Sequence, residues 1–164
     1  MKTKRLTKDA MLTAAALIIF IVEAQIPLPV SAPGLKLGLA NVITLYAMFA
    51  LGPRDALAIL LCRVFLGSLF SGRVTTFIYS ACGGMACYLL TLLLRPMMGK
   101  NQIWLCGLLG ALAHNIGQVA AAVAVTSTPS LVVYLPPLMI AGAFTGSFTG
   151  MCAQLVINRK DLPR

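Results

Sequence analysis

The sequence predicts an all-α fold in which a single domain, residues 1–164, forms a bundle of six transmembrane helices. The first observation is composition: 59% of the residues are hydrophobic and 10% are charged, against about 45–50% and about 25% in a soluble domain. The second is a mean hydropathy of +0.91. The third is that segments rich in proline, glycine or charge divide the chain into long apolar runs.

Each expected helix is one of these apolar runs. A transmembrane helix needs about 20 residues, so a chain of 164 residues has room for a handful of spans joined by short loops. The second and third runs are short, and we expect one of them to extend into a flanking loop or to lie where the bilayer is thinned. The expected helices are residues 10–26, 37–51, 55–70, 75–94, 103–125 and 137–157.

The segments between the runs carry residues that end helices, and Pro53 and Pro137 suit a first helical turn. The first break contains three prolines and few polar side chains. We expect it either to fold over the mouth of the bundle as a lid or to form a plain structural turn. The breaks are PLPVSAPGLK (27–36), GPRD (52–55), SGRV (71–74), RPMMGKNQ (95–102) and TSTPSLVVYLP (126–136).

The basic residues predict the orientation, because cytoplasmic loops collect Lys and Arg. With six helices and a cytoplasmic N-terminus, both termini are cytoplasmic, Lys36 and Arg73 face outside, and Arg63 lies inside the third helix. Topology and contact with anionic lipid then explain the net charge of +9, so we expect no nucleic-acid partner. The residues placed in the cytoplasm are Lys2, Lys4, Arg5, Lys8, Arg54, Arg95, Lys100, Arg159, Lys160 and Arg164.

The five cysteines all fall inside expected helices, where we expect them to pack as small apolar side chains. Cys82 and Cys87 are five residues apart and therefore lie on different helix faces, which fits no common metal site. We expect neither a metal ion nor a cofactor. The cysteines are Cys62, Cys82, Cys87, Cys106 and Cys152.

Small residues mark two surfaces for close helix packing. The last helix contains Gly142, Gly146 and Gly150 at a spacing of four residues, which lets a neighbouring backbone approach closely, and we expect that neighbour to belong to the same chain. The first helix presents Ala10 and Ala14 near its cytoplasmic end. This alanine face is either a docking surface for a partner subunit or ordinary helix filler.

Three polar side chains interrupt the fifth apolar run: His114, Asn115 and Gln118. Each costs kilocalories in hydrocarbon unless it is paired, so we expect them to share partners. His114 and Gln118 are four residues apart and face the same way, while Asn115 is turned by about 100°. They form either a hydrogen-bond network that holds the bundle or a ligand site, and we favour the ligand site.

Arg63 lies about eight residues into its helix, near the centre of the bilayer, and needs a partner there. Glu23 is the acidic residue available to the outer half, so a structural ion pair between the two is one reading. The other is that Arg63 binds an anionic ligand, or donates hydrogen bonds to backbone carbonyls and water. With Lys36, Asn41 and Arg73 also at the outer side, positive charge is in excess, and an anionic small molecule would complement it.

Four segments carry a resemblance to the Gx transporter family, whose members are often labelled heptaprenyl diphosphate synthase component I. This family is similar in size and helix plan to the substrate-binding S components of energy-coupling factor (ECF) transporters. Tyr79, within the third of the segments, completes the candidate ligand-binding residues. The segments are PGLKLGLANVITLYAMFALG (33–52), LCRVFLGSLFSG (61–72), FIYSACGGM (77–85) and GALAHNIGQVAAA (110–122).

The resemblance implies a bacterial inner-membrane protein that binds a small organic solute outside and passes it inward with an ATP-driven module. It implies a transmembrane coupling subunit docked on the alanine face of the first helix, and a ligand beneath the first external loop. The chain has no G-x-x-x-x-G-K-[ST] motif, so ATP hydrolysis is expected from separate ATPase subunits. The solute class expected is a vitamin, an isoprenoid or a quinone precursor.

The label of a synthase component does not predict catalysis by this chain. Prenyl diphosphate synthases hold magnesium with clustered aspartates, whereas the acidic residues here are scattered at positions 9, 23, 55 and 161. We therefore expect no enzyme activity. Two alternatives stay open: a noncatalytic membrane subunit for prenyl diphosphate or quinone synthesis, and a membrane subunit for flavin- or quinone-linked electron transfer.

Overall fold

A computed structural model describes residues 2–25 and 36–160. In these residues the chain forms six α-helices and three short 3₁₀-helices, and no strand. The elements are α1 Lys2–Glu23, α2 Asn41–Ala50, α3 Pro53–Ser71, α4 Val74–Leu94, η1 Arg95–Met97, η2 Lys100–Gln102, α5 Ile103–Thr126, η3 Pro129–Tyr134 and α6 Leu135–Lys160.

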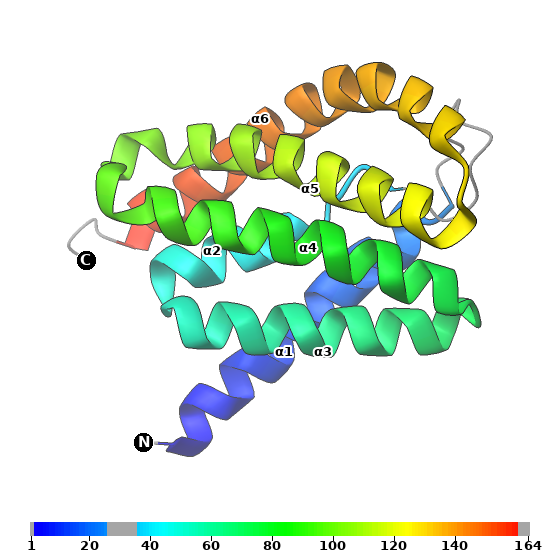
Figure 1. The fold of residues 1–164 in the computed structure, drawn as a ribbon. Helices are drawn as coiled ribbons and strands as arrows, with labels where there is room; N and C mark the ends of the chain where they lie inside the picture. Colours follow the sequence, from blue (N-terminus) through cyan, green and yellow to red (C-terminus); the bar gives the residue numbers. More distant parts are fainter. Residues whose placement is uncertain (1, 26–35, 161–164) are drawn as a thin grey trace.

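Figure 1 shows the bundle with two distinct ends. The start of α1, the α2–α3 turn, the α4–α5 connection and the end of α6 lie at one end, while the α3–α4 turn and the α5–α6 connection lie at the other. The first end carries most of the basic residues, including Arg5, Arg54, Arg95 and Arg159, whereas the second carries Arg73. This unequal distribution of charge is the pattern of a membrane protein with an even number of spans.

Three helices are long and apolar enough to cross a membrane by length and composition: Val74–Met97, Ile103–Thr126 and Pro129–Arg159. Among the other described helices, α1 and α3 contain more charged residues, and α2 has only 10 residues. The prediction of an all-α membrane bundle is confirmed. At 1.5 Å per residue, α2 is about 15 Å long and reaches through about half of the hydrocarbon layer.

The predicted start of the second helix, at residue 37, is wrong. The helix begins at Asn41, because Gly38 has a φ of +80°, a left-handed conformation that a right-handed helix cannot contain. Leu37 and Leu39 flank this glycine and made the apolar run look continuous. The preceding segment, predicted as a lid or turn at 27–36, lies outside the described residues except for Lys36.

Most of the other helix boundaries lie within three residues of those expected, and the start of the first helix lies eight residues earlier. The first helix starts at Lys2 rather than 10, because the basic stretch before the apolar run is also helical. It ends at Glu23 rather than 26. The last helix starts at Leu135 rather than 137. Pro136 and Pro137 therefore sit in its first turn, where the missing N–H of proline costs nothing.

The glycines of α6 pack against α5, so the expected neighbour of this strip is within the chain. A Cβ atom on Gly146 would lie 2.6 Å from Cβ of Ala111 and 2.7 Å from the carbonyl oxygen of Gly107. A Cβ atom on Gly150 would lie 2.6 Å from the carbonyl oxygen of Trp104, and one on Gly142 would meet Nδ2 of Asn115. The two backbones thus touch along several turns, which fixes where α5 stands.

An ion pair ties α1 to α3 at the basic end of the bundle. The guanidinium of Arg5 donates to both carboxylate oxygens of Asp55, with Nη2 and Nε at 2.7 and 2.8 Å from Oδ1 and Oδ2. Further along, Gly67 of α3 makes room for the ring of Phe20, which a Cβ atom would approach to 2.5 Å. These two contacts hold both ends of α1 against α3.

The cysteines divide between the interior and the helix surfaces. Cys87 and Cys106 are buried, whereas Cys62 and Cys82 are exposed and Cys152 is partly exposed. The expectation of packing residues therefore holds for the first two and not for Cys62 and Cys82, which project from the outer faces of their helices.

Candidate functional site

Seven polar side chains are buried together in the half of the bundle that contains the end of α1 and the start of α2. None of them is more than 9% exposed. We call this set the polar cluster. Its members come from α1, from residues 36–40, which we call the segment before α2, and from helices α2, α3 and α5. They are Glu23, Lys36, Asn41, Arg63, His114, Asn115 and Gln118.

Gln118 joins α5 to the segment that precedes α2. Its Oε1 atom accepts a hydrogen bond from the backbone N–H of Lys36 at 3.1 Å, and its Nε2 atom donates to the carbonyl oxygen of Lys36 at 2.6 Å. One amide side chain therefore satisfies both backbone groups of a residue that lies in neither a helix nor a strand. This matters in a membrane protein, where an unpaired backbone group costs several kcal/mol.

Asn115 extends the same network toward α6. Its Nδ2 atom donates to the carbonyl oxygen of Leu138 at 2.6 Å, and its Oδ1 atom accepts from Nε2 of Gln118 at 3.0 Å. Asn115 therefore reaches a second helix, α6, and holds a neighbour on its own helix. The neighbour that it holds is Gln118 rather than His114.

Two residues near the end of α1 hold the segment before α2. The carboxylate of Glu23 accepts a hydrogen bond from the backbone N–H of Gly38 through Oε1. The ammonium of Lys36 lies over the ring of Phe20, 3.1 Å from its centroid, and donates to the carbonyl oxygen of Phe20 at 3.5 Å. A cation over an aromatic face is attracted by the ring quadrupole, most strongly where water is excluded.

Arg63 is the largest buried polar side chain of the cluster, with 2% exposed. Its Nη2 atom donates to Oδ1 of Asn41 at 3.0 Å. Its Nε atom has no hydrogen-bond partner within the described residues, and neither have Nδ2 of Asn41 and Oγ1 of Thr44. A guanidinium and an amide therefore each keep an unsatisfied donor in a place where such donors are costly.

His114 is enclosed by two glycines. A Cβ atom on Gly38 would lie 2.9 Å from Cδ2 of His114, and a Cβ atom on Gly83 of α4 would lie 2.9 Å from Nδ1. The imidazole, 3% exposed, thus fills a gap that only glycines leave open. Larger side chains at either position would push His114 out of its place between α4 and the segment before α2.

The structure assembles most of the predicted site residues and separates two from them. Tyr79 is buried in an apolar group with Val119 and Leu138. Arg73 is exposed just before α4, beyond the end of α3 at Ser71, which itself lies about 12 Å of helix rise past Arg63. Within the described residues Tyr79 makes no hydrogen bond to the polar cluster, and the α3–α4 turn carries Arg73 to the end of the bundle.

Glu23 and Arg63 each have a different direct partner from the one considered in the sequence. Glu23 bonds to the backbone of Gly38 and Arg63 bonds to Asn41. Within the described part of the chain, the ion pair that forms is between Arg5 and Asp55. Glu23 is close enough to Arg63 and Lys36 to interact through charge, but the cluster still holds two cations and one carboxylate.

Three residues that contact the polar cluster were not predicted from the sequence: Phe20, Gly38 and Gly83. Phe20 lies in an unbroken apolar run and carries no signal of a contact with a lysine. Gly38 and Gly83 fall inside two of the segments that carry the family resemblance, but no role was predicted for either glycine. What they approach, the ring of His114, becomes visible only in the folded chain.

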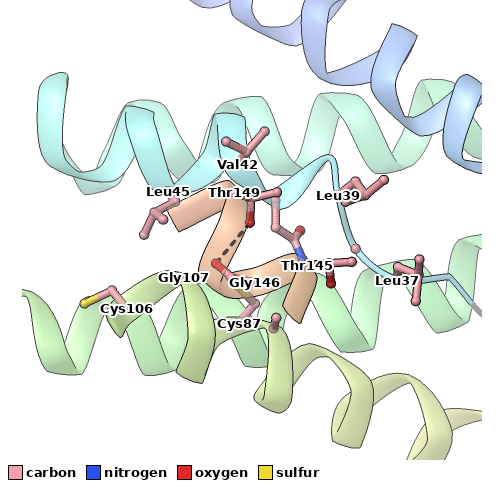
Figure 2. Close-up of a pocket in the computed structure, with 13 residues that line it drawn as sticks. Leu37, Leu39, Val42, Leu45, Cys87, Cys106, Gly107, Thr145, Gly146 and Thr149 are labelled. Atoms are coloured by element: carbon pink, nitrogen blue, oxygen red, sulfur yellow. Dashed lines mark hydrogen bonds between the residues drawn. The ribbon is translucent and has the colours of Figure 1, made fainter. Parts of the chain in front are cut away.

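The space beside the cluster is small. A cavity of about 10 Å³ lies next to Asn41 and Gly38, which is roughly the volume that one water molecule needs. Figure 2 shows its lining residues arriving from residues 37–45, α4, α5 and α6, with Thr145 and Thr149 on one side and Cys87 and Cys106 on another. In this conformation the polar side chains contact one another, and a solute of several atoms needs the site to widen.

The alanine face of α1 is exposed at the basic end of the bundle. Ala10 and Ala14 lie on the surface of the helix. Leu6 and Ile18 extend the same four-residue spacing and are 69% and 63% exposed. The described helices thus leave an apolar strip of α1 uncovered, with small side chains at its middle.

The family model described as heptaprenyl diphosphate synthase component I matches residues 12–156. The chain belongs to the heptaprenyl diphosphate synthase component I family. The match includes every member of the polar cluster, the small residues of α6, and Ala14 of α1. No curated protein and no solved structure matches the chain.

Membership of the heptaprenyl diphosphate synthase component I family confirms the resemblance seen in the sequence. The family name describes a component of a synthase and thus a protein that works with others. Among the described acidic residues, Asp9 and Glu23 belong to α1 and Asp55 belongs to α3; Asp9 and Asp55 are close enough to interact through charge.

Proposed function

We propose that this protein is the substrate-binding subunit, similar to an S component, of an ATP-driven ECF-type importer for a small anionic organic solute. The observation that carries the proposal is the buried Arg63. Its Nε atom has no partner among the described residues, and Nδ2 of Asn41, the residue that Arg63 contacts through Nη2, is also unpaired. Both atoms are donors, and a carboxylate or phosphate oxygen is the acceptor that would satisfy them together.

The charge of the cluster supports an anion. Arg63 and Lys36 are cations buried with one carboxylate, that of Glu23. A buried charge without a counter-ion is expensive, so an excess of one positive charge in the bundle favours a ligand with a negative group. The vitamin, isoprenoid and quinone-precursor classes all contain small anionic members with an apolar body that suits a membrane site.

A route to this site follows from the bonds that close it. The segment before α2 is held by the side chains of Gln118 and Glu23, and these bonds can open without unwinding a helix. The left-handed Gly38 provides a pivot next to them. Movement of Lys36 and Gly38 away from α5 would widen the small cavity beside Asn41 and expose Arg63 to the outside.

The rest of the proposal concerns coupling. The chain carries no phosphate-binding loop, so transport requires separate ATPase subunits and a transmembrane coupling subunit. The exposed strip around Ala10 and Ala14 suits close contact with a helix of that coupling subunit. On this proposal the basic end of the bundle and both termini face the cytoplasm of a bacterium, and the chain itself catalyses no reaction.

Gentle purification followed by native mass spectrometry tests the proposal. The wild-type protein is expected to retain a small anionic molecule, and Arg63→Ala is expected to lose it while keeping its helical circular dichroism. Leu93→Ala, at a position on α4 that is 69% exposed, is the matched control and should retain the molecule. A wild-type protein that carries no solute and takes up none in cells with intact ECF ATPases would contradict it.

A second candidate follows from the family name: a noncatalytic membrane subunit that assists a prenyl diphosphate synthase. The apolar surface of the helices and the anion-binding potential of the cluster would then serve a prenyl diphosphate. Purification from membranes distinguishes the two functions. An associated prenyltransferase favours this candidate, and an associated ATPase pair favours transport.

A further inference from the structure

The α3–α4 turn carries a groove that the polar cluster does not use. The groove has a volume of about 320 Å³, which is within the range of small-molecule sites. Its walls are largely apolar and come from the last turns of α3 and the first turns of α4. The lining side chains include Phe65, Ser68, Leu69, Arg73, Val74 and Phe77.

The apolar walls face away from the bundle. Phe65 is 56% exposed, Leu69 is 63% exposed and Val74 is 75% exposed. In a membrane-spanning bundle such a surface is covered by lipid rather than by water. The groove is lined by the last turns of α3 and the first turns of α4, and the turn between these helices lies at one end of the bundle (Figure 1). The ends of a membrane-spanning bundle meet the lipid headgroups.

Arg73 stands in the wall of this groove as its one charged side chain. It is exposed, and it forms no hydrogen bond or ion pair within the described residues. An arginine at the membrane boundary lays its apolar stem along the surface and extends its guanidinium to the headgroups. The guanidinium binds a phosphate through two parallel N–H groups. In a zwitterionic headgroup the neighbouring cation weakens this attraction.

We propose that this groove binds an anionic phospholipid of the phosphatidylglycerol type, with the phosphate at Arg73 and an acyl chain against Phe65, Leu69 and Phe77. Charge complementarity selects the headgroup, and the apolar walls require the chain. An anion alone would leave the walls empty, and a neutral lipid would leave Arg73 without a counter-ion. The site is separate from the polar cluster and does not depend on the transported solute.

Native mass spectrometry of the purified protein tests this site with dioleoyl phosphatidylglycerol and dioleoyl phosphatidylcholine mixed in equal amounts. The wild-type protein is expected to bind phosphatidylglycerol in preference. Arg73→Gln is expected to lower that preference about fivefold, since one basic residue near a charged headgroup contributes about 1 kcal/mol. The matched control is Arg54→Gln, which removes an exposed arginine from the first turn of α3 at the opposite end.

Two further measurements distinguish binding of the whole lipid from binding of its phosphate alone. Ser68→Phe, which places a ring in the groove, is expected to reduce bound phosphatidylglycerol although Arg73 is intact. Glycerol phosphate, which offers a phosphate group without the acyl chains, is expected not to displace the lipid. An unchanged preference in Arg73→Gln, an equal loss in Arg54→Gln, or displacement by glycerol phosphate would each overturn the proposal.

Discussion

Gln118 pairs with the backbone of Lys36 as a neighbouring strand would, accepting from its N–H at 3.1 Å and donating to its carbonyl oxygen at 2.6 Å. The two residues are 82 positions apart in the chain. Their pairing holds the segment before α2 against the centre of α5, and places Gly38 over His114. Within the described residues, Gln118 is therefore the one side chain of α5 that hydrogen-bonds to this segment.

Replacing Gln118 with alanine is expected to destabilise the protein before any solute is considered. The N–H and carbonyl of Lys36 and Oδ1 of Asn115 would lose their partner, and unsatisfied buried groups cost on the order of 1–3 kcal/mol each where water cannot replace the bond. Thermal unfolding in detergent is expected to show a clear fall in the melting temperature of Gln118→Ala. A melting temperature equal to that of wild type would mean that the pairing does not hold the segment.

Gln102→Ala is the control for this measurement. Gln102 is an exposed glutamine whose Oε1 atom accepts one bond, from the backbone N–H of Gly99 at 3.1 Å. Because water can replace that bond, its loss is expected to have little effect on stability. The difference between the two variants reports on burial rather than on the loss of an amide.

Replacing Gly146 with leucine is expected to separate α5 from α6. The new Cβ atom would lie 2.6 Å from Cβ of Ala111 and 2.7 Å from the carbonyl oxygen of Gly107, and a backbone carbonyl cannot move aside cheaply. Overpacking of this kind costs about 1–3 kcal/mol. The measurement is thermal unfolding, with Gly99→Ala as control, since its Cβ atom would meet only Oε1 of Gln102 at 3.7 Å. Equal stability of the two variants would show that the helices are not in close contact.

Arg63→Ala is expected to weaken binding of the co-purified solute roughly tenfold or more, because a hydrogen bond to a charged group contributes about 1.5–3 kcal/mol. Arg63→Lys keeps the charge but loses the planar fork that reaches Asn41, so an intermediate affinity is expected. Isothermal titration with the purified proteins measures both. If Arg63→Ala and His114→Ala lower the melting temperature without solute and leave its affinity intact, the cluster is a packing network and not a ligand site.

The helices could be predicted from the sequence because apolar runs and their breaks are local properties. The start of α2 could not, because Leu37 and Leu39 continue the apolar pattern through Gly38, whose φ of +80° keeps it out of the helix. Hydropathy detects a run of apolar residues, but it does not detect the backbone conformation inside that run.

The polar cluster could be predicted in outline because a polar side chain in an apolar run is conspicuous. His114, Asn115 and Gln118 are brought together with Arg63 and Asn41 as expected. The partners could not be assigned, since they depend on how the helices are rotated about their axes. That rotation turns Tyr79 toward Leu138 and into an apolar core, and no spacing within α4 reveals it.

The orientation of the bundle is expected to follow its charge. In a variant without the native cysteines, a cysteine at Arg73 should react with a membrane-impermeant maleimide added to intact cells, and a cysteine at Lys100 should react only after the cells are opened. The reason is the excess of basic residues at the end that contains Lys100. The parent without any cysteine measures background labelling. Reaction of Lys100→Cys from outside intact cells would reverse the topology.

Ala14→Trp is expected to abolish solute uptake while the isolated protein still binds the solute. Ala14 lies at the middle of the exposed strip of α1, and an indole there would keep a partner helix from the close approach that small residues permit. The polar cluster is at the other end of the helix, near Glu23, and should be undisturbed. Leu93→Trp, on an exposed face of α4, controls for a bulky residue at the lipid surface and should leave uptake unchanged. Unimpaired uptake by a well-expressed Ala14→Trp protein would mean that this face is helix filler, and a joint loss of uptake and binding would place the damage in the fold instead.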